Sequence, residues 1–220
     1  MSRKQIAVLG LGRFGASVAR TLVEQGHEVL GIDADADLVD QFSNLLTHTM
    51  VADCTDEAAL RSLGLRNMDA AVVAIGHDVQ ASILATVLLK EIGVPLVVAK
   101  AAGDLHGRTL AKVGADKVVY PERDMGARVA HSLLTGAVTD YIELSPEITI
   151  MEMAAPERIV GKTLRDLNLR ARFGLNVMAI KKGEQINAAP LATDLVDSGD
   201  VLVLLGSNDS VRRLERMLQG

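Results

Sequence analysis

The sequence predicts an α/β fold with two domains: a doubly wound parallel sheet followed by a second, smaller α+β domain. Three observations lead to this prediction. Short β-branched runs alternate with helical stretches over the first 120 residues, a glycine-rich turn joins the first strand to the first helix, and the rhythm of the elements changes near residue 140. Strands that alternate with helices form an open parallel sheet with right-handed crossovers. The first domain is therefore expected to be of the Rossmann type.

The strands of the first domain carry apolar runs without strict alternation, such as AVVAI and LVVAK. Such runs are typical of strands that are buried on both faces of a parallel sheet. Several of the helices between them end at a glycine (Gly26, Gly64, Gly93), which adopts the left-handed C-cap readily. The expected strands are 5–10, 28–33, 48–52, 70–75, 95–100 and 117–120, and the expected helices are 13–25, 36–45, 56–63, 79–92 and 104–112.

A longer helix is expected from Pro121 to about Leu134, and it carries an apolar stripe. Met125, Val129, Leu133 and Leu134 lie on one side of this helix. A long amphipathic helix beside a domain boundary must bury that side somewhere. The stripe therefore predicts either an interface with another copy of the chain or packing on the chain's own sheet.

The second domain follows this helix. Three strands and two short helices of a small α+β module are expected there. The domain boundary is placed near residue 140, which gives a nucleotide-binding domain over 1–140 and a regulatory domain over 141–220. The expected strands are 148–154, 175–181 and 200–205, and the expected helices are 162–168 and 208–218.

Composition excludes several classes of function. The 220 residues include 23 basic and 28 acidic side chains, a net charge of −5, and only 2% are aromatic, so neither a phosphate-tracking surface nor base stacking is expected. Nucleic acid is thus not expected as a partner. The single cysteine, Cys54, excludes an internal disulfide framework. No apolar run approaches the roughly 18 residues of a membrane span, so a soluble, cytoplasmic chain is expected.

The strongest motif is Gly10-Leu-Gly12-Arg-Phe-Gly15, which directly follows the first strand and opens the first helix. Gly10 permits the tight turn, Gly12 lets the backbone approach a diphosphate, and Gly15 lets the helix pack closely on the strand. The unpaired N–H groups at the start of the helix attract phosphates. An acidic residue, Asp33, closes the second strand, where its carboxylate is expected to accept hydrogen bonds from the ribose hydroxyls.

The residues around this motif bear on which nucleotide binds. Asp33 is followed by Ala-Asp-Ala-Asp with no basic residue, which disfavours the 2′-phosphate of NADP. Arg13 and Phe14 stand inside the phosphate loop itself. A guanidinium at position 13 grips additional anionic oxygens, which suits ADP or ATP better than the two phosphates of a dinucleotide. The alternative is that Arg13 is a solvated arginine at the helix start.

The ends of the third and fourth strands are expected to supply the purine half of the crevice, because ligands of open α/β sheets bind outside the carboxyl ends of the strands. Asp53, Cys54 and Thr55 follow the third strand, and Ile75 and Gly76 follow the fourth. The three residues after the third strand each have a simpler interpretation. Thr55 or Asp53 could cap the next helix, and Cys54 could be a small buried apolar residue rather than a nucleophile.

An enzyme of this fold requires an acid–base arrangement that the sequence does not offer. The five histidines are scattered with no paired spacing, and neither a GK[ST] nor an HExxH motif is present. A nucleotide-binding sensor is therefore favoured over a catalyst. Two alternatives stay open: a small NAD-dependent oxidoreductase, and a redox sensor that reads the NADH/NAD⁺ ratio.

The motifs together resemble a known family, the cytoplasmic regulatory subunits of Ktr and Trk potassium uptake systems, which are built from a domain that regulates K⁺ conductance. Besides Asp33, the segments that carry the resemblance are AVLGLGRFG, VADCTD, VVAIGHDVQASI, KVGADKVVYPERDMG and LNLRARFG. The resemblance implies an amino-terminal domain that binds ATP, ADP or NAD(H). It also implies paired Rossmann domains in an octameric ring beneath a membrane-embedded potassium transporter, at the inner face of the cell membrane.

The resemblance also assigns roles to single residues. It places Gly10, Gly12, Gly15 and Asp33 on the nucleotide and Arg13 on the terminal phosphate. It also implies that Lys100 lies in the nucleotide crevice, and that Glu122 assists the binding of Mg²⁺ or another cation near ATP. The simpler reading of Glu122 is a carboxylate at a helix start.

In some relatives, residues that match Asn168–Phe173 hold a cyclic dinucleotide. Arg170 and Arg172 offer charge for a phosphate there, although two arginines at a helix end are usually a solvated face.

Overall fold

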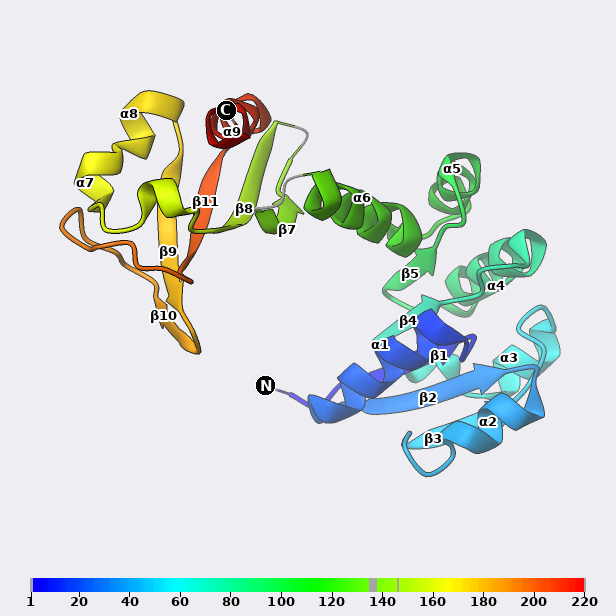
Figure 1. Ribbon diagram of the computed structural model, residues 1–220. Helices are drawn as coiled ribbons and strands as arrows, with labels where there is room; N and C mark the ends of the chain where they lie inside the picture. The colour runs from blue at the N-terminus through cyan, green and yellow to red at the C-terminus, as the bar shows by residue number, and fades with distance from the viewer. Residues whose placement is uncertain (1, 135–137, 146, 220) are drawn as a thin grey trace. The chain divides into compact units, whose positions relative to one another are not determined.

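The computed structural model describes residues 2–134, 138–145 and 147–219, and it divides into two compact units, residues 1–123 and 124–220 (Figure 1). Each unit has its own sheet and its own hydrophobic core. None of the described helices is both long enough and apolar enough to cross a bilayer.

The first unit is built on a six-stranded sheet in the order β3-β2-β1-β4-β5-β6, and every neighbouring pair is parallel. β1 and β4 lie side by side in the middle of the sheet. From β1 the chain continues outward through β2 and β3, and from β4 it continues outward on the other side through β5 and β6. The strands are β1 (Gln5–Leu9), β2 (Glu28–Asp33), β3 (His48–Val51), β4 (Ala70–Val73), β5 (Val97–Lys100) and β6 (Lys117–Val119).

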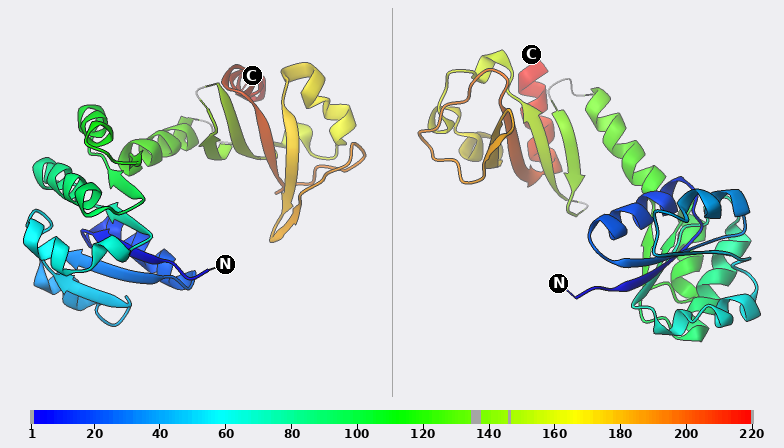
Figure 2. Two further views of the ribbon diagram at one scale, coloured as in Figure 1. Left: turned by 180° about the vertical axis from the view of Figure 1, so that it is seen from behind. Right: turned by 90° about the horizontal axis from the view of Figure 1, so that it is seen from below.

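Helices cover both faces of this sheet, as Figure 2 shows. One face packs against α1 and α2, and the other packs against α3, α4 and α5. The sheet is therefore doubly wound, as the sequence predicts. The helices are α1 (Arg13–Glu24), α2 (Ala36–Phe42), α3 (Glu57–Ser62), α4 (Val79–Ile92) and α5 (Asp104–Lys112), with a short 3₁₀ turn, η1, at Leu65–Asn67.

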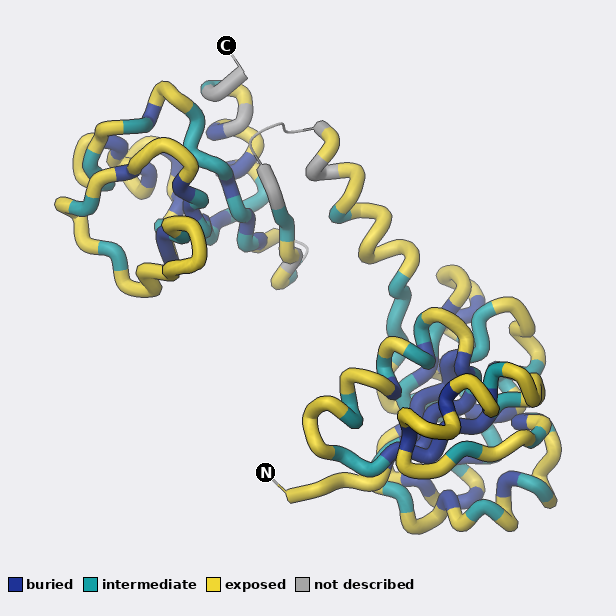
Figure 3. Tube along the Cα trace, turned by 60° about the horizontal axis from the view of Figure 1, so that its bottom comes forward, coloured by how far each residue is buried: buried dark blue, intermediate teal, exposed yellow. Residues whose placement is uncertain are grey.

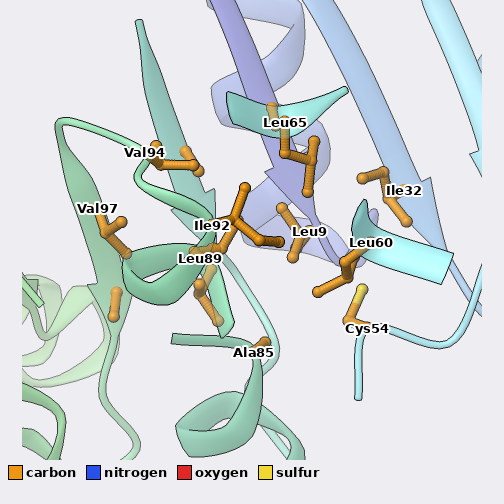
Figure 4. Close-up of a cluster of buried hydrophobic side chains, with 14 of the residues drawn as sticks. Leu9, Ile32, Cys54, Leu60, Leu65, Ala85, Leu89, Ile92, Val94 and Val97 are labelled. Carbon is orange, nitrogen blue, oxygen red and sulfur yellow. The ribbon is translucent and has the colours of Figure 1, made fainter. Parts of the chain in front are cut away.

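A cluster of apolar side chains forms the core between the sheet and α3 to α5 (Figure 4). Leu9 of β1, Leu60 of α3 and Leu89 of α4 are completely buried there. Burial of each such side chain stabilises the fold by about 1.5–3 kcal/mol. In Figure 3 the buried residues of this unit, coloured dark blue, lie at its centre.

The second unit has a five-stranded antiparallel sheet in the order β10-β9-β11-β8-β7. Alternate residues of β8 and β11 are buried, so one face of the sheet packs against the core. The strands are β7 (Val138–Glu143), β8 (Ile148–Ala154), β9 (Asn176–Lys182), β10 (Gln185–Asn187) and β11 (Val201–Ser207). The helices are η2 (Glu157–Ile159), α7 (Leu164–Leu167), α8 (Leu169–Phe173) and α9 (Asn208–Gln219).

The second unit differs from the sequence prediction in three details. β7 and β10 were not expected, because each relies on pairing with a neighbour rather than on its own apolar pattern. The helix expected at 162–168 is two short helices, since Asn168 takes a left-handed conformation (φ 44°) between α7 and α8. The boundary expected near residue 140 falls inside β7, whereas the two compact units divide within α6 (Pro121–Leu134).

The apolar stripe of α6 is exposed. Met125 is 52% exposed, Val129 51% and Leu133 80%, and the side chain of Leu134 lies outside those that the structure describes. Figure 3 shows the exposure along this helix. Packing of these three residues on the chain's own sheet, one of the two alternatives from the sequence, is therefore not observed.

Candidate functional site

The candidate site lies at the carboxyl edge of the parallel sheet. All six strands end at this edge, and the strand order reverses between β1 and β4. Sheets of this kind form a ligand crevice outside the strand ends at such a reversal. The predicted residues Asp33, Asp53, Gly76, Lys100 and Glu122 all lie at or just beyond strand ends on this edge.

The glycine turn after β1 has the geometry that a phosphate loop requires. Gly10 takes a positive φ of 94°, and an added Cβ would lie only 3.2 Å from the backbone that follows β4. A Cβ on Gly15 would lie 1.8 Å from the carbonyl oxygen of Gly10, so no side chain fits there. By contrast, nothing lies within 4 Å of a Cβ built on Gly12. The backbone at Gly12 is thus open to a ligand.

Helix α1 begins directly at this turn. Gly12 is its N-cap, and the N–H of Ala16 donates to the Gly12 carbonyl over 2.8 Å. The first N–H groups of a helix have no intrahelical acceptor, and the helix dipole adds positive potential at the same end. No acidic residue stands in the first turn of α1 to use that potential. The start of α1 is therefore suited to an anionic group.

Asp33, at the end of β2, is tied to the phosphate loop. One carboxylate oxygen accepts a hydrogen bond from the N–H of Leu11 over 2.6 Å, and the other accepts from the N–H of Asp35 over 3.0 Å. The sequence did not predict the bond to Leu11, although the strand order places β1 beside β2. Asp33 therefore fixes the turn, and each of its oxygens keeps a further lone pair for a hydroxyl group.

Asp53 and Thr55 form a local turn. The Asp53 carboxylate accepts from the N–H of Thr55 over 2.8 Å and from its hydroxyl over 2.7 Å. The backbone bond, followed by the hydroxyl bond, lowers the pKa of Asp53. The capping role considered for these two residues is wrong: Asp56 caps α3, accepting from the N–H groups of Ala58 and Ala59.

Cys54 behaves as a small apolar residue. It is buried in the core beside Leu60, as Figure 4 shows. Burial, with smaller contributions from the negative charges of Asp33 and Asp53, raises the pKa of its thiol to about 12. The thiolate is the reactive form, so this burial favours the apolar role of Cys54 over a nucleophilic one.

Lys100 and Glu122 form an ion pair across neighbouring strand ends. Lys100 Nζ lies 2.6 Å from Glu122 Oε1, and it also lies 5.7 Å from the centre of the Phe14 ring in the phosphate loop. The hydrogen bond from Lys100 is the largest cause that lowers the pKa of Glu122, and the positive charge of Arg13 contributes. The structure thus brings together Arg13, Phe14, Lys100 and Glu122, four residues that the sequence predicted separately.

Arg13 is exposed at the first position of α1. With Ala16, Ser17 and Arg20 it lines an open groove of about 280 Å³ along the outer side of the helix. Arg13 and Arg20 are therefore available to an anion in solution, and Arg13 is the one that acts electrostatically on Glu122.

Glu122 is the carboxylate that the sequence analysis considers for a bound cation. Among the described residues, no group of three or more His, Cys, Asp or Glu side chains could hold a metal ion. Glu122 supplies carboxylate oxygens of the kind that Mg²⁺ prefers, but it supplies them alone. Phosphate oxygens or a second copy of the chain would have to complete the coordination.

In the second unit, the arginines considered for a cyclic dinucleotide serve local structure or face solvent. Arg170 is exposed, and Arg172 donates to the Leu167 carbonyl over 3.4 Å and lies against the Phe173 ring.

The fold and the glycine turn define the class: a Rossmann-type unit joined to a small α+β unit. The TrkA-N domain family matches residues 6–121, and the TrkA-C domain family matches residues 148–219. The Ktr system potassium uptake protein C of Bacillus subtilis (strain 168) is 45% identical over 214 residues, 97% of this chain and 97% of that protein. The chain belongs to this family of Ktr and Trk potassium uptake proteins.

Further relatives agree. The Ktr system potassium uptake protein A of Vibrio alginolyticus is 39% identical over 208 residues, 94% of each chain. Among solved structures, the RCK domain of GsuK superposes with a TM-score of 0.71 at 18% identity, over 100% of this chain and 48% of that one. The GsuK channel bound to NAD gives 0.68, also at 18% identity, over 100% of this chain and 40% of that one. At this identity the structures show a shared fold. The resemblance and the fold class predicted from the sequence are both confirmed.

Proposed function

We propose that the chain is a nucleotide-binding regulatory subunit of a membrane-embedded potassium transporter, and that ATP and ADP are its ligands. One observation carries the proposal: the glycine turn at the start of α1, the Asp33 carboxylate and the cationic Arg13 and Lys100 lie at one sheet edge in a chain of the potassium uptake family.

Each residue has a task in this proposal. The N–H groups at the start of α1 receive the phosphates, and the open backbone at Gly12 lets them approach. Asp33 accepts the ribose hydroxyls, while Asp35 and Asp37 disfavour a 2′-phosphate. Thr55 and the turn at Ile75 and Gly76 line the purine side. Arg13 meets the terminal phosphate.

NAD(H) is the second candidate ligand, and a specific observation favours it. A channel with this fold, GsuK, has been solved with NAD bound, and the Asp33 position suits the unmodified ribose of NAD as well as that of ATP. The two candidates differ at Arg13, which has more charge to bind on a triphosphate than on the diphosphate bridge of NAD.

Assembly follows from the exposed stripe on α6. Met125, Val129 and Leu133 present apolar side chains to solvent, and a second copy of the chain would cover them. We expect paired Rossmann domains, assembled further into an octameric ring at the inner face of the cell membrane. ATP must bind one shape of this ring better than another, because equal affinity would shift no population.

The partner can be identified directly. The tagged chain is incubated with solubilised membranes of its own cells, and the proteins that are retained are identified by mass spectrometry. A potassium transporter is the expected result. Asp33→Ala serves as the matched control, since it should keep the fold but lose nucleotide-dependent retention. Capture of soluble dehydrogenases or of no membrane protein would contradict the proposal.

A finer prediction separates ATP from ADP. Arg13→Ala removes a charge that reaches the terminal phosphate, so it should weaken ATP binding by about 1.5–3 kcal/mol and ADP binding by less. Arg20→Ala, seven residues further along α1 in the same exposed groove, is the matched control and should change neither affinity. Calorimetric titrations of the three proteins give the comparison. Equal losses for ATP and ADP in the Arg13 variant would remove Arg13 as the reader of the γ-phosphate.

A further inference from the structure

The strand at one edge of the first sheet, β3, has a free outer side. β3 is the terminal strand, and β2 is its one neighbour in the sheet (Figure 1). Edge strands are commonly protected by a lysine or a proline. β6, at the opposite edge, begins with the exposed Lys117, whereas β3 has the sequence His-Thr-Met-Val and carries neither. The outer N–H and C=O groups of β3 are therefore open to pairing with another extended segment.

Apolar side chains border this free edge. Met50 is 43% exposed, Val51 49%, and Leu45, shortly before the strand, 37%. Met50 and Val51 are consecutive residues of a strand, so their side chains point to opposite faces of the sheet. A strand added beside β3 would therefore cover apolar surface on both faces, in addition to forming backbone hydrogen bonds.

The segment that contains β3 also carries the negative charge of the chain. Residues 21–60 include nine acidic side chains and no lysine or arginine. Since the whole chain has 23 basic and 28 acidic residues, the rest of it holds 23 basic and 19 acidic ones and is net positive. Residues 21–60 span β2, α2, β3 and the start of α3, so this charge is concentrated at the β3 side of the sheet.

Most of these carboxylates are available to a partner. Glu28 is paired with Arg3, and Glu57 with Arg61. In the part of the chain that the structure describes, no ion pair neutralises a larger exposed set on either side of β3, which consists of Asp35, Asp37, Asp40, Asp53 and Asp56. A basic partner would therefore be attracted to this edge.

The charge selects which segment can pair with β3. A second copy of the same edge would bring the same acidic residues, and like charges that face each other cost binding energy. An extended segment that alternates lysine or arginine with apolar residues matches both the charge and the apolar border. Cytoplasmic segments of membrane proteins are rich in these two basic residues.

We propose that the β3 edge docks a basic, extended cytoplasmic segment of the membrane-embedded transporter, which adds to the first sheet as a further strand. The strand edge supplies the site, and the acidic residues around it supply the selectivity. The assignment of the segment to the transporter rests on the proposed function, whereas the binding of a basic strand at β3 does not.

The first test uses two fluorescein-labelled peptides, which alternate Thr or Val with Lys in one and with Glu in the other. Fluorescence anisotropy with the full-length chain, without nucleotide, should show binding of the lysine peptide and none of the glutamate peptide. Met50→Lys adds a protecting charge to the edge and should weaken binding of the lysine peptide about tenfold or more. The double variant Asp37→Asn with Asp40→Asn should weaken it about fivefold or more.

Each variant has a matched control away from the edge. Leu96→Lys places the same charge on a side chain that is 44% exposed and lies just before β5. Glu91→Gln with Glu184→Gln removes the same amount of charge from exposed positions elsewhere. Both controls should change the affinity less than about twofold. Thermal unfolding of each variant confirms that the fold is retained.

Retention from solubilised membranes identifies the source of the segment. Met50→Lys should lose the potassium transporter that wild type retains, and Leu96→Lys should keep it. Undiminished retention by Met50→Lys would show that the transporter does not dock at β3. If wild type itself retains no transporter, the proposed function fails and the assignment of the segment fails with it, while the peptide titrations report on the edge independently.

Three results of the peptide titrations would overturn the docking site itself. If wild type does not bind the lysine peptide, the edge is no docking surface. If Met50→Lys binds it as wild type does, the peptide lies elsewhere. If Glu91→Gln with Glu184→Gln weakens binding as much as the change at Asp37 and Asp40, the attraction depends on net charge alone.

Discussion

The two units of this chain use their polar side chains in opposite ways. In the first unit, Asp33, Lys100 and Glu122 gather at one edge of the sheet, around a loop with open backbone. In the second unit, polar groups are committed to local structure: Thr163 and Asp166 form a capping box, and Asp140 binds Arg128.

Sheet topology explains much of this difference. Parallel strands all end at the same edge, so residues that follow different strands converge there. Antiparallel strands end alternately at opposite edges, so the same number of polar residues is dispersed. A ligand site built from strand ends is therefore expected in the first unit. A site in the second unit would need residues from one face or from another copy of the chain.

The largest effect should come from a side chain placed inside the phosphate loop. Gly15→Ala puts a Cβ against the Gly10 carbonyl, and backbone on both sides must shift, so the first unit should lose about 3 kcal/mol or more of its unfolding free energy. Gly12→Ala adds the same atom where nothing lies within 4 Å, and it should cost well under 1 kcal/mol. Urea unfolding followed by circular dichroism measures both. Equal losses would contradict the loop geometry described above.

A core substitution in each unit sharpens the comparison. Leu89 of the first unit and Leu204 of the second are completely buried, so replacing either by alanine should cost about 2–5 kcal/mol. Only Leu89→Ala should weaken ATP binding, because binding is coupled to the folding of the first unit.

The chain provides a separate reporter for each unit. It has two tyrosines, Tyr120 in the first unit and Tyr141 in the second. Tyrosine fluorescence in Tyr120→Phe and Tyr141→Phe backgrounds follows each unit by itself. If ATP raised the unfolding midpoint seen through Tyr141 as much as that seen through Tyr120, the assignment of the ligand to the first unit would be wrong.

A smaller effect concerns acid stability. The hydrogen bond from Arg128 is the largest cause that lowers the pKa of Asp140, so this carboxylate stabilises the second unit above its ordinary pKa of about 3.8. That contribution is lost as the pH falls through the lowered value. Asp140→Asn should therefore cost under about 1 kcal/mol at pH 7, because the pair is partly exposed, and the variant and wild type should converge in acid. A difference that is constant with pH would rule out the charge as its source.

The sequence predicts the first unit better than the second, and the reason is physical. Apolar runs, the glycine turn and an acidic strand end are each local, and together they define the parallel sheet and most of the site. Strands β7 and β10 lie at the two edges of the second sheet, and each pairs with a single neighbouring strand. Neither carries an apolar run of its own, so no local pattern predicts it. The break at Asn168 needs an unusual backbone conformation that asparagine adopts only in some contexts.

Within the site, the sequence identified the residues but not their partners. Lys100 and Glu122 were expected as separate contacts of the ligand, and their ion pair follows only from the adjacency of β5 and β6. The Leu11–Asp33 bond likewise depends on β1 lying beside β2. The order of strands in the sheet was the missing information in both cases.

The most direct measurement is a set of calorimetric titrations of the full-length chain with ATP, ADP and NADH, repeated with Asp33→Ala. We predict that ATP and ADP bind at least about tenfold more tightly than NADH, and that Asp33→Ala weakens all three by about 1.5–3 kcal/mol. Asp35→Ala, at the cap of α2, is the control and should retain most of the affinity. NADH binding more tightly than ATP would instead favour a redox sensor. Unchanged affinities in the Asp33 variant would contradict the nucleotide site at the carboxyl edge of the sheet.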